Sequence, residues 1–305
     1  MTSTRSTYMD LLYHTYVCNC CTTEDSEAFS SFFWFADMTD DAAGSTHMNS
    51  ADDLRVTRDD LGPVATIEIL RGPENYLDVE LVAAIADVLD ELELDQSSRA
   101  IVLVSEGKHF CAGARLSSSA DDLPTGDSNP LYDQVVRLFR GSVPIIAAVQ
   151  GAAIGAGLGL ALAADFRIAA PEARFAATFA RLGFHQGFGL SVTLARVVGE
   201  QRATEMLYTG RRLTGDDALA IGLCDRLVPA DQLRAAAHAL ATEIAGSAPL
   251  AVRAIRRTMR GALAEQVATA TDIEHRAQQV LRRTDDYREG VAATAERRSP
   301  VFRAQ

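Results

Sequence analysis

The sequence predicts an α/β fold, and three of its features support this prediction. After residue 63, short aliphatic runs with strand patterning alternate with longer segments of helical hydrophobic period. A glycine-rich segment joins one of these strands to an apolar helix, and from about residue 214 onward the pattern is helical. With 305 residues, 48% of them hydrophobic, the chain can bury a sizeable core. We expect one large domain with appendages rather than two equal halves.

Strand and helix patterns alternate through the first part of this domain and are separated by turn residues. A long polar stretch, 117–130, interrupts them. We interpret it as a mobile flap over an active site, because long loops of this kind are commonly functional. The expected elements are a strand over 64–70, a turn over 71–75, a helix over 79–94, a strand over 100–105, a glycine-containing loop over 107–113 and a helix over 131–140.

The second part of the domain contains the glycine-rich junction and the helical end of the chain. Thr214 and Asp217 have the spacing of a helix N-cap. The expected elements are a strand over 145–150, the glycine-rich turn over 151–157, an apolar helix over 158–164, a strand over 166–169 and helices over 235–244, 249–264 and 267–283.

The segment 151–159, Gly-Ala-Ala-Ile-Gly-Ala-Gly-Leu-Gly, lies between a predicted strand and a predicted helix. Small residues let backbone N–H groups approach a ligand closely, and a helix N-terminus favours developing negative charge. Taken alone, the segment also fits a tightly packed junction with no ligand. It is not a dinucleotide fingerprint, because no acidic residue ends a strand about 20 residues later, and it lacks the Gly-Lys-Ser/Thr ending of a phosphate loop.

A second junction, 108–116, follows the strand at 100–105. Acyl-thioester chemistry needs two converging donors that hold an enolate or a tetrahedral oxyanion, and two such junctions can supply them. The pair of segments 110–116, Phe-Cys-Ala-Gly-Ala-Arg-Leu, and 150–157, Gln-Gly-Ala-Ala-Ile-Gly-Ala-Gly, resembles the enoyl-CoA hydratase/isomerase (crotonase) superfamily. The resemblance runs from about Leu54 to the C-terminus.

Further segments in the same order strengthen this resemblance, namely Arg71 to Asn75, Ala163 to Ala169, Phe175 with Leu182 and Gly183, Gly210 to Ala218, and Gly222 to Val228. The resemblance implies a crotonase (ClpP/crotonase-like) fold, which is a spiral of ββα units. It places the core at 54–245 and a helical C-terminal region at 246–305. The family uses that region for trimer contacts, so a homotrimer or homohexamer follows by analogy.

The resemblance also implies roles for individual residues. The backbone N–H groups of Ala114 and Ala156 correspond to the oxyanion hole that polarises the thioester carbonyl, and an amide donor needs no particular side chain. The neighbouring residues Ala112, Arg115 and Gly155 are expected to contact the acyl-CoA substrate. Arg115 replaces an acidic residue common in this loop and is either a phosphate-facing cation or a surface residue. CoA is part of the substrate, and no other cofactor and no metal is implied.

Two positions depart from the family pattern. Hydratases of the family carry one glutamate two residues after the glycine-rich turn and a second about twenty residues later, and together these hold and activate the water. Here the two positions are Gly159 and Phe179. Neither side chain can transfer a proton, so hydration of a 2-enoyl-CoA by the usual pair is not expected.

Replacement acid–base groups must come from nearby segments. His185 is the best single candidate, because an unperturbed imidazole titrates near neutral pH, although a hydrogen-bonded loop histidine is an equally good interpretation. Asp165 is expected to be structural. The remaining candidates are Thr178, Arg181, Gln186, His109, Tyr132 and Asp133.

Three functions remain open on this basis. The first is hydratase/isomerase-like chemistry on an acyl-CoA through an enolate held by Ala114 and Ala156. The second is hydrolysis of a carbon–carbon bond in a cyclic diketone, a reaction of superfamily members with altered catalytic residues. The third is acyl-CoA binding without turnover.

The formal net charge of −12 disfavours nonspecific binding to nucleic acid or to an anionic membrane. The phosphates of a substrate would therefore need local cations. The C-terminal third supplies candidates, namely Arg253, Arg256, Arg257, Arg260, Arg282 and Arg283.

The first 50 residues differ from the rest, being aromatic and Ser/Thr-rich without sustained period, and we expect a disordered or spurious extension with translation starting near Met48. They contain Cys18, Cys20 and Cys21, but no second Cys/His pair follows at zinc-finger spacing, and nothing resembles a disulfide framework. The segment lacks the regions of a secretory signal. No run of 18 apolar residues occurs in the chain. We expect a cytoplasmic protein.

Overall fold

The computed structural model describes residues 47–48, 53–58, 62–114 and 129–305. Most of the expected N-terminal extension and most of the polar flap at 117–130 lie outside the described residues.

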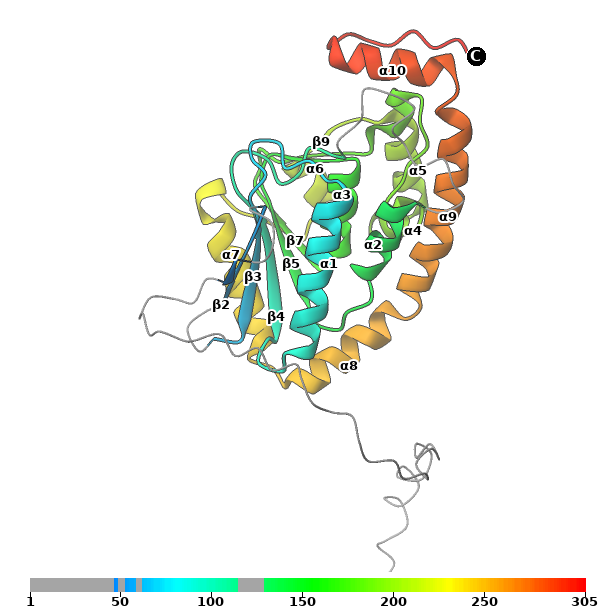
Figure 1. The fold of residues 1–305 in the computed structure, drawn as a ribbon. Helices are drawn as coiled ribbons and strands as arrows, with labels where there is room; N and C mark the ends of the chain where they lie inside the picture. The colour runs from blue at the N-terminus through cyan, green and yellow to red at the C-terminus, as the bar shows by residue number, and fades with distance from the viewer. Residues whose placement is uncertain (1–46, 49–52, 59–61, 115–128) are drawn as a thin grey trace, which may run out of the picture. The chain divides into compact units, whose positions relative to one another are not determined.

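The central element is a seven-stranded sheet in the described part of the chain (Figure 1). Its order is β1-β2-β3-β4-β5-β7-β10. From β3 to β10 neighbouring strands are parallel, whereas β1 and β2 pair antiparallel at one edge. The strands are β1 (His47–Met48), β2 (Leu54–Arg58), β3 (Val64–Ile69), β4 (Ala100–Ser105), β5 (Ile145–Val149), β7 (Phe166–Ala169) and β10 (Arg226–Leu227).

Helices cover both faces of this sheet, which explains why its central strands are apolar throughout. Successive residues of β4 alternate between the two faces. Val102 and Val104 pack with α7 (Leu233–Ala245), whereas Ile101 and Leu103 belong to the core that includes α1 (Val79–Leu94). The layers are therefore helix, sheet and helix.

A second, smaller sheet explains the ββα repeat. Its three short strands are β6 (Ala152–Ile154), β8 (Arg174–Ala176) and β9 (Leu213–Thr214). β5 enters the large sheet, β6 enters the small one, and α3 (Ala156–Ala163) follows. β7 and β8 repeat this order before the 3-10 helix η2 (Thr178–Leu182). The predicted spiral of ββα units is confirmed, although β6 was expected to be part of a turn and β8 was not predicted.

The remaining helices flank these units and form the C-terminal part. They are α2 (Pro130–Arg137), α4 (Leu190–Val198), α5 (Glu200–Thr209), α6 (Gly215–Ala220), η3 (Ala230–Gln232), α8 (Pro249–Arg260), α9 (Leu263–Leu281) and α10 (Asp285–Ala295). The predicted cap is present at α6, where Thr214 and Asp217 bond each other's backbone N–H groups.

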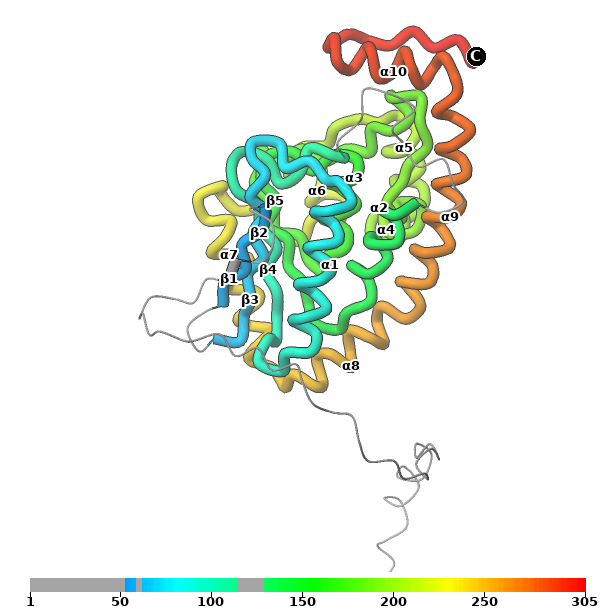
Figure 2. Tube along the Cα trace, viewed as in Figure 1, coloured from blue at the N-terminus to red at the C-terminus, as the bar shows by residue number. Residues whose placement is uncertain are grey.

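The C-terminal helices differ in two places from the prediction. The helix expected over 249–264 ends at Arg260, because Gly261 adopts a left-handed φ of 54° that a regular helix cannot include. α9 therefore starts four residues earlier than expected, and α10 was not predicted. In Figure 2, α9 runs beside α2 and α4, which it contacts. Within the described residues, no helix combines the length and apolar character needed to cross a membrane.

Candidate active site

The two junctions singled out in the sequence lie side by side. They follow the neighbouring parallel strands β4 and β5, and parallel strands end at the same edge of a sheet. Backbone hydrogen bonds join them directly. The amide of Cys111 donates to Ala152 O at 2.8 Å, and the amide of Ile154 donates to Cys111 O at 3.1 Å. Two segments separated by about forty residues thus form one continuous piece of structure.

Gly157 makes this close approach possible. A Cβ at this position would lie 2.2 Å from the carbonyl oxygen of Cys111, which is far inside van der Waals contact. Because the clash involves backbone, no side-chain rotation can relieve it. Gly157 therefore has a packing role that holds the start of α3 against the 111–114 segment.

The amides of Ala114 and Ala156 belong to the two adjoining segments. Ala156 is the first residue of α3, and the amides of a helix's first turn have no intrahelical acceptor. Next to Ala114, the amide of Leu77 donates to Gly113 O. Among the described residues, no backbone hydrogen bond engages the amide of Ala114 or Ala156. Two unengaged donors therefore belong to adjoining segments.

The three residues expected to contact the substrate are placed differently. The amide of Ala112 donates to Glu74 O and that of Gly155 to Ala176 O, both at 2.8 Å, so these two residues shape the backbone without offering a free donor. Gly155 has φ 56° and ψ −116°, which a side chain would disfavour. Arg115 lies outside the described residues.

Two glycines of this junction, Gly159 and Gly155, each lie against an aromatic ring. A Cβ on Gly159 would stand 2.5 Å from the ring of Phe188, which is buried and fills that space. At the second position, the Phe179 ring lies 3.7 Å from a Cβ built on Gly155. The rings of Phe188 and Phe179 therefore give this junction apolar surroundings.

His185 lies in the 183–189 loop that also carries Phe188. Its Nδ1–H donates to Gln186 O at 2.9 Å, since a carbonyl oxygen can only accept. The Gln278 side chain of α9 donates to the carbonyls of His185 and Gln186, and Tyr132 O–H donates to Gln278 Oε1 at 2.8 Å. The loop is held in place by a buried polar network.

Glu274 belongs to the same network and was not predicted from the sequence. Its carboxylate accepts bonds from the Gly189 amide and from the Ser191 amide and hydroxyl, and so caps the N-terminus of α4. Burial raises its pKa, while these hydrogen bonds oppose that shift. A sequence signal existed, because Glu274 shares a helix face with Val267 and Gln278 at helical spacing.

Comparison with known proteins places this arrangement in a family. The family model described as enoyl-CoA hydratase/isomerase matches residues 61–305. The chain belongs to the enoyl-CoA hydratase/isomerase family.

Relatives and solved structures of the family match along most of their length. The chain is 34% identical over 243 residues to the 1,2-epoxyphenylacetyl-CoA isomerase of Escherichia coli, covering 76% of this chain and 92% of that protein. It is 33% identical over 262 residues to the carnitinyl-CoA dehydratase of Salmonella arizonae, covering 83% and 99%. The crystal structure of an enoyl-CoA hydratase/isomerase from Pseudoalteromonas atlantica superposes with a TM-score of 0.74 at 31% identity, over 83% of this chain and 100% of the other. These matches confirm the crotonase fold.

The other candidate residues of this family member have structural partners. His109 Nδ1 accepts from the Ala152 amide at 3.1 Å, and burial, together with Lys108, lowers the pKa of His109. Burial raises the pKa of the Cys111 thiol to about 12, so it remains protonated at neutral pH. Tyr132 is buried in the network beneath the 183–189 loop, and burial raises its pKa.

The side chains of three further candidates have other partners or are exposed. Arg181 donates to Thr209 O, Gln186 donates to the Ser191 hydroxyl, and Asp133 is an exposed acid in the first turn of α2. Thr178 begins η2, directly before Phe179. None of these contacts gives the side chain a proton-transfer partner among the described residues, so His185 remains the leading prediction.

Proposed function

We propose that this chain is an acyl-CoA enzyme that moves a proton at the carbon next to the thioester carbonyl. The amides of Ala114 and Ala156 hold the enolate oxygen, and His185 transfers the proton. The observation that carries this proposal is the pair of unengaged amides on two adjoining segments, one of them at the N-terminus of α3.

The apolar surroundings favour proton movement within the substrate over addition of water. A hydratase must hold a water and activate it with carboxylates. Here Gly159 carries no side chain, the Phe188 ring fills the space beside it, and Phe179 lies against Gly155. An enolate needs only the two amides and one base, which makes isomerisation or α-proton exchange the better match to these residues.

His185 suits the role of that base because of its tautomer and its loop. With Nδ1–H donated to Gln186 O, Nε2 is free to accept a proton. The ring of Phe188 contacts Gly159 on α3, and Gly159 is three residues after Ala156. His185 is three residues before Phe188 in the sequence. Three residues span at most about 11 Å, so His185 lies within that distance of Phe188, which supports this choice of base.

The names of relatives support a CoA thioester as the substrate. The Escherichia coli relative is an isomerase and the Salmonella relative a dehydratase, and both names specify a CoA ester. We therefore propose an acyl-CoA substrate for this chain and leave its acyl group to experiment.

The test is incubation of the full chain with 2-enoyl, 3-enoyl and aryl-CoA esters in D₂O, with mass spectrometry of the product and of deuterium at the α-carbon. Ala156→Pro removes one donor at a position where helices tolerate proline. A residue before proline normally adopts an extended conformation. Gly155, at φ 56° and ψ −116°, has dihedral angles of opposite sign to that conformation, which a glycine can adopt before proline. We expect a loss of product or exchange of about 10²-fold or more.

His185→Ala tests the base, with His238→Ala on α7 as the matched control. We expect exchange to vanish in the first variant and to persist in the second. Binding of the esters by the wild type without product or exchange would instead show an acyl-CoA-binding protein. Cleavage of a free cyclic diketone, with no action on CoA esters, would show a carbon–carbon hydrolase.

We also propose that the C-terminal helices mediate a homotrimer or homohexamer. Leu250 on α8 and Ile273 and Val280 on α9 are exposed apolar side chains, and exposed apolar surface of this kind is typical of subunit contacts. Light scattering on purified protein measures the mass. A monomer at micromolar concentration would refute the assembly.

A further inference from the structure

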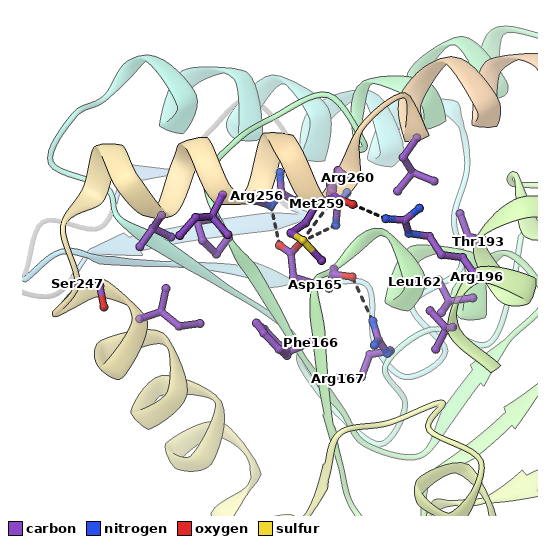
Figure 3. A pocket seen from close by; sticks show the side chains of 17 residues that line it. Leu162, Asp165, Phe166, Arg167, Thr193, Arg196, Ser247, Arg256, Met259 and Arg260 are labelled. Atoms are coloured by element: carbon purple, nitrogen blue, oxygen red, sulfur yellow. Dashed lines mark hydrogen bonds and ion pairs between the residues drawn. The ribbon is translucent and has the colours of Figure 1, made fainter. Parts of the chain in front are cut away.

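A cavity of about 430 Å³ lies at the end of α3 far from Ala156. It is open on one side and is lined by the end of α3, the start of β7, α4, the end of α7 and α8 (Figure 3). α3 has eight residues and is therefore about 12 Å long, so the cavity is separate from the oxyanion segment. Its walls are mainly apolar, with Leu162, Phe166, Val197, Ile244 and Val252 among them.

Asp165 and two arginines of α8 form a buried ion cluster in the wall of this cavity, with the contacts dashed in Figure 3. Arg256 Nε lies 2.7 Å from Asp165 Oδ2, and Arg260 Nε lies 3.0 Å from Asp165 Oδ1. Arg256 also donates to Gly141 O, and Arg260 donates to Ala163 O. Asp165 is thus structural, as the sequence analysis expected.

The charges around the cavity do not balance. Of the four arginines that line it, Arg167 is paired with Asp225, and Arg196 donates to Met259 O. Asp165 is the single carboxylate in the lining and is shared by two guanidinium groups. A buried cation without a counter-ion is strongly unfavourable.

Two guanidinium nitrogens of this cluster have no acceptor. Nη2 of Arg256 and Nη1 of Arg260 are buried and without a hydrogen-bond partner among the described residues. Arg256 is only 6% exposed. Buried donors are almost always satisfied in folded proteins, and an unsatisfied one in a cavity wall indicates a missing partner. Burial lowers the pKa of Arg260 to about 10, so its guanidinium is still a cation at neutral pH.

We propose that this cavity binds an aliphatic carboxylate, whose head group pairs with Arg256 and Arg260 and whose chain lies along the apolar walls. A carboxylate brings two oxygens for two unpaired N–H donors and one negative charge where the Asp165 cluster lacks one. The volume is within the range of small-molecule sites. Met259, between the two arginines on α8, is exposed and unbranched, so it can move to admit the head group.

The charge distribution argues against two other occupants. A phosphate dianion would carry more oxygens and more charge than two N–H donors and one unbalanced cation can satisfy. An uncharged apolar molecule, or an apolar surface of a second copy of this chain, would leave Arg256 and Arg260 unsatisfied. The carboxylate is the ligand that fulfils both the polar and the apolar requirements.

The test is isothermal titration calorimetry of the full chain with sodium octanoate, 1-octanol and sodium butyrate. We expect saturable binding of octanoate at one site per chain, and binding weaker by at least about tenfold for 1-octanol, which lacks the charge, and for butyrate, which lacks the chain. Arg260→Gln removes one donor and should weaken octanoate by at least about tenfold, whereas Arg257→Gln, an exposed neighbour on the same helix, should leave it within about twofold.

A second variant keeps the test independent of the ion cluster. Val252→Phe narrows the cavity from its apolar side and should also abolish octanoate binding. Absence of saturable binding by the wild type, or equal binding by Arg260→Gln, overturns the proposal. Binding that octanoyl-CoA displaces and that Arg260→Gln leaves unchanged would place the octanoate in the active site, which also overturns it. A fall in oligomeric mass in Arg260→Gln, with no octanoate binding by the wild type, would assign the cavity to a second copy of the chain.

Discussion

The ring of Phe188 lies against the Cα of Gly159, so closely that a Cβ on Gly159 would stand 2.5 Å from ring atom Cδ1. Phe188 itself has a left-handed φ of 64°, which is unusual for an aromatic residue. The resemblance implies that the first glutamate of hydratases corresponds to Gly159, so two residues determine the space at that position. Gly159 has no side chain, and the Phe188 ring, carried on a backbone of left-handed φ, fills the space beside it.

Restoring the glutamate alone should fail for this reason. We expect Gly159→Glu to destabilise the fold by at least about 2 kcal/mol, because the side chain overlaps the ring and places a carboxylate among apolar groups. Adding Phe188→Gly should recover part of the loss, giving a coupling of about 1–3 kcal/mol. Urea unfolding of the two single variants and the double variant measures it. Additive effects would show that the two positions are independent.

Gly157 should tolerate no side chain. Gly157→Ala puts a methyl group 2.2 Å from Cys111 O, so the two oxyanion segments must separate. We expect a loss of about 1–3 kcal/mol in stability, together with the loss of α-proton exchange. Gly246→Ala is the matched control, because its Cβ would meet no atom closer than 3.4 Å. Unchanged exchange in Gly157→Ala would argue against the proposed oxyanion geometry.

Asp165 should be among the least replaceable charged residues. Burial opposes its ionisation, but Arg256 and Arg260 outweigh this and hold its pKa below the ordinary value. Asp165→Asn leaves both guanidinium groups without a counter-ion, and we expect a cost of about 3–5 kcal/mol. Asp87→Asn, at an exposed pair with Arg137, should cost less than about 1 kcal/mol. Equal midpoints of urea unfolding for the two variants would contradict this expectation.

The order of elements could be predicted because period and turn residues are local signals. The strand at 100–105 and the helix at 79–94 have the predicted bounds, since each has a clean pattern and clear flanking residues. β6 and β8 were missed because three-residue strands carry too little pattern. β6 pairs with β8, which lies about twenty residues further along the chain, and a pairing of this kind leaves no local signal in the sequence.

The candidate site could be predicted only in part. The Ala114 and Ala156 segments were singled out because, taken together, they resemble the enoyl-CoA hydratase/isomerase superfamily. The contact of Phe188 with Gly159 was not, since nothing local to either residue indicates that the 183–189 loop packs on α3. The role of Glu274 depends in the same way on α9 packing against α4.

The C-terminal tail should remain attached in moderately acidic solution. Glu289 accepts bonds from Arg298 and from the Val301 amide, and these contacts lower its pKa to about 2. Because the folded pKa lies below the ordinary value, the contact is complete above pH 4.5 and is lost as the pH falls toward 2. We expect the Val301 methyl resonances in ¹³C-labelled protein to be unchanged from pH 7 to 4. Glu289→Gln should shift them already at pH 7, and a wild-type midpoint near 4.5 would contradict the assignment.

Glu274 should stabilise the 183–189 loop through its charge as well as its shape. In Glu274→Gln, the amide group would turn its N–H₂ toward the Gly189 or the Ser191 donors, leaving at least one buried donor unsatisfied. We expect a loss of about 1–3 kcal/mol in stability, whereas Glu265→Gln, exposed on the same helix, should change stability by less than about 0.5 kcal/mol. If His185 acts as the base, loosening this loop should also lower the rate of α-proton exchange, with little change in binding of the thioester at the Ala114 and Ala156 amides. If Glu274→Gln loses the expected stability but keeps the wild-type rate of α-proton exchange, the 183–189 loop does not supply the base. The base would then be sought at another residue.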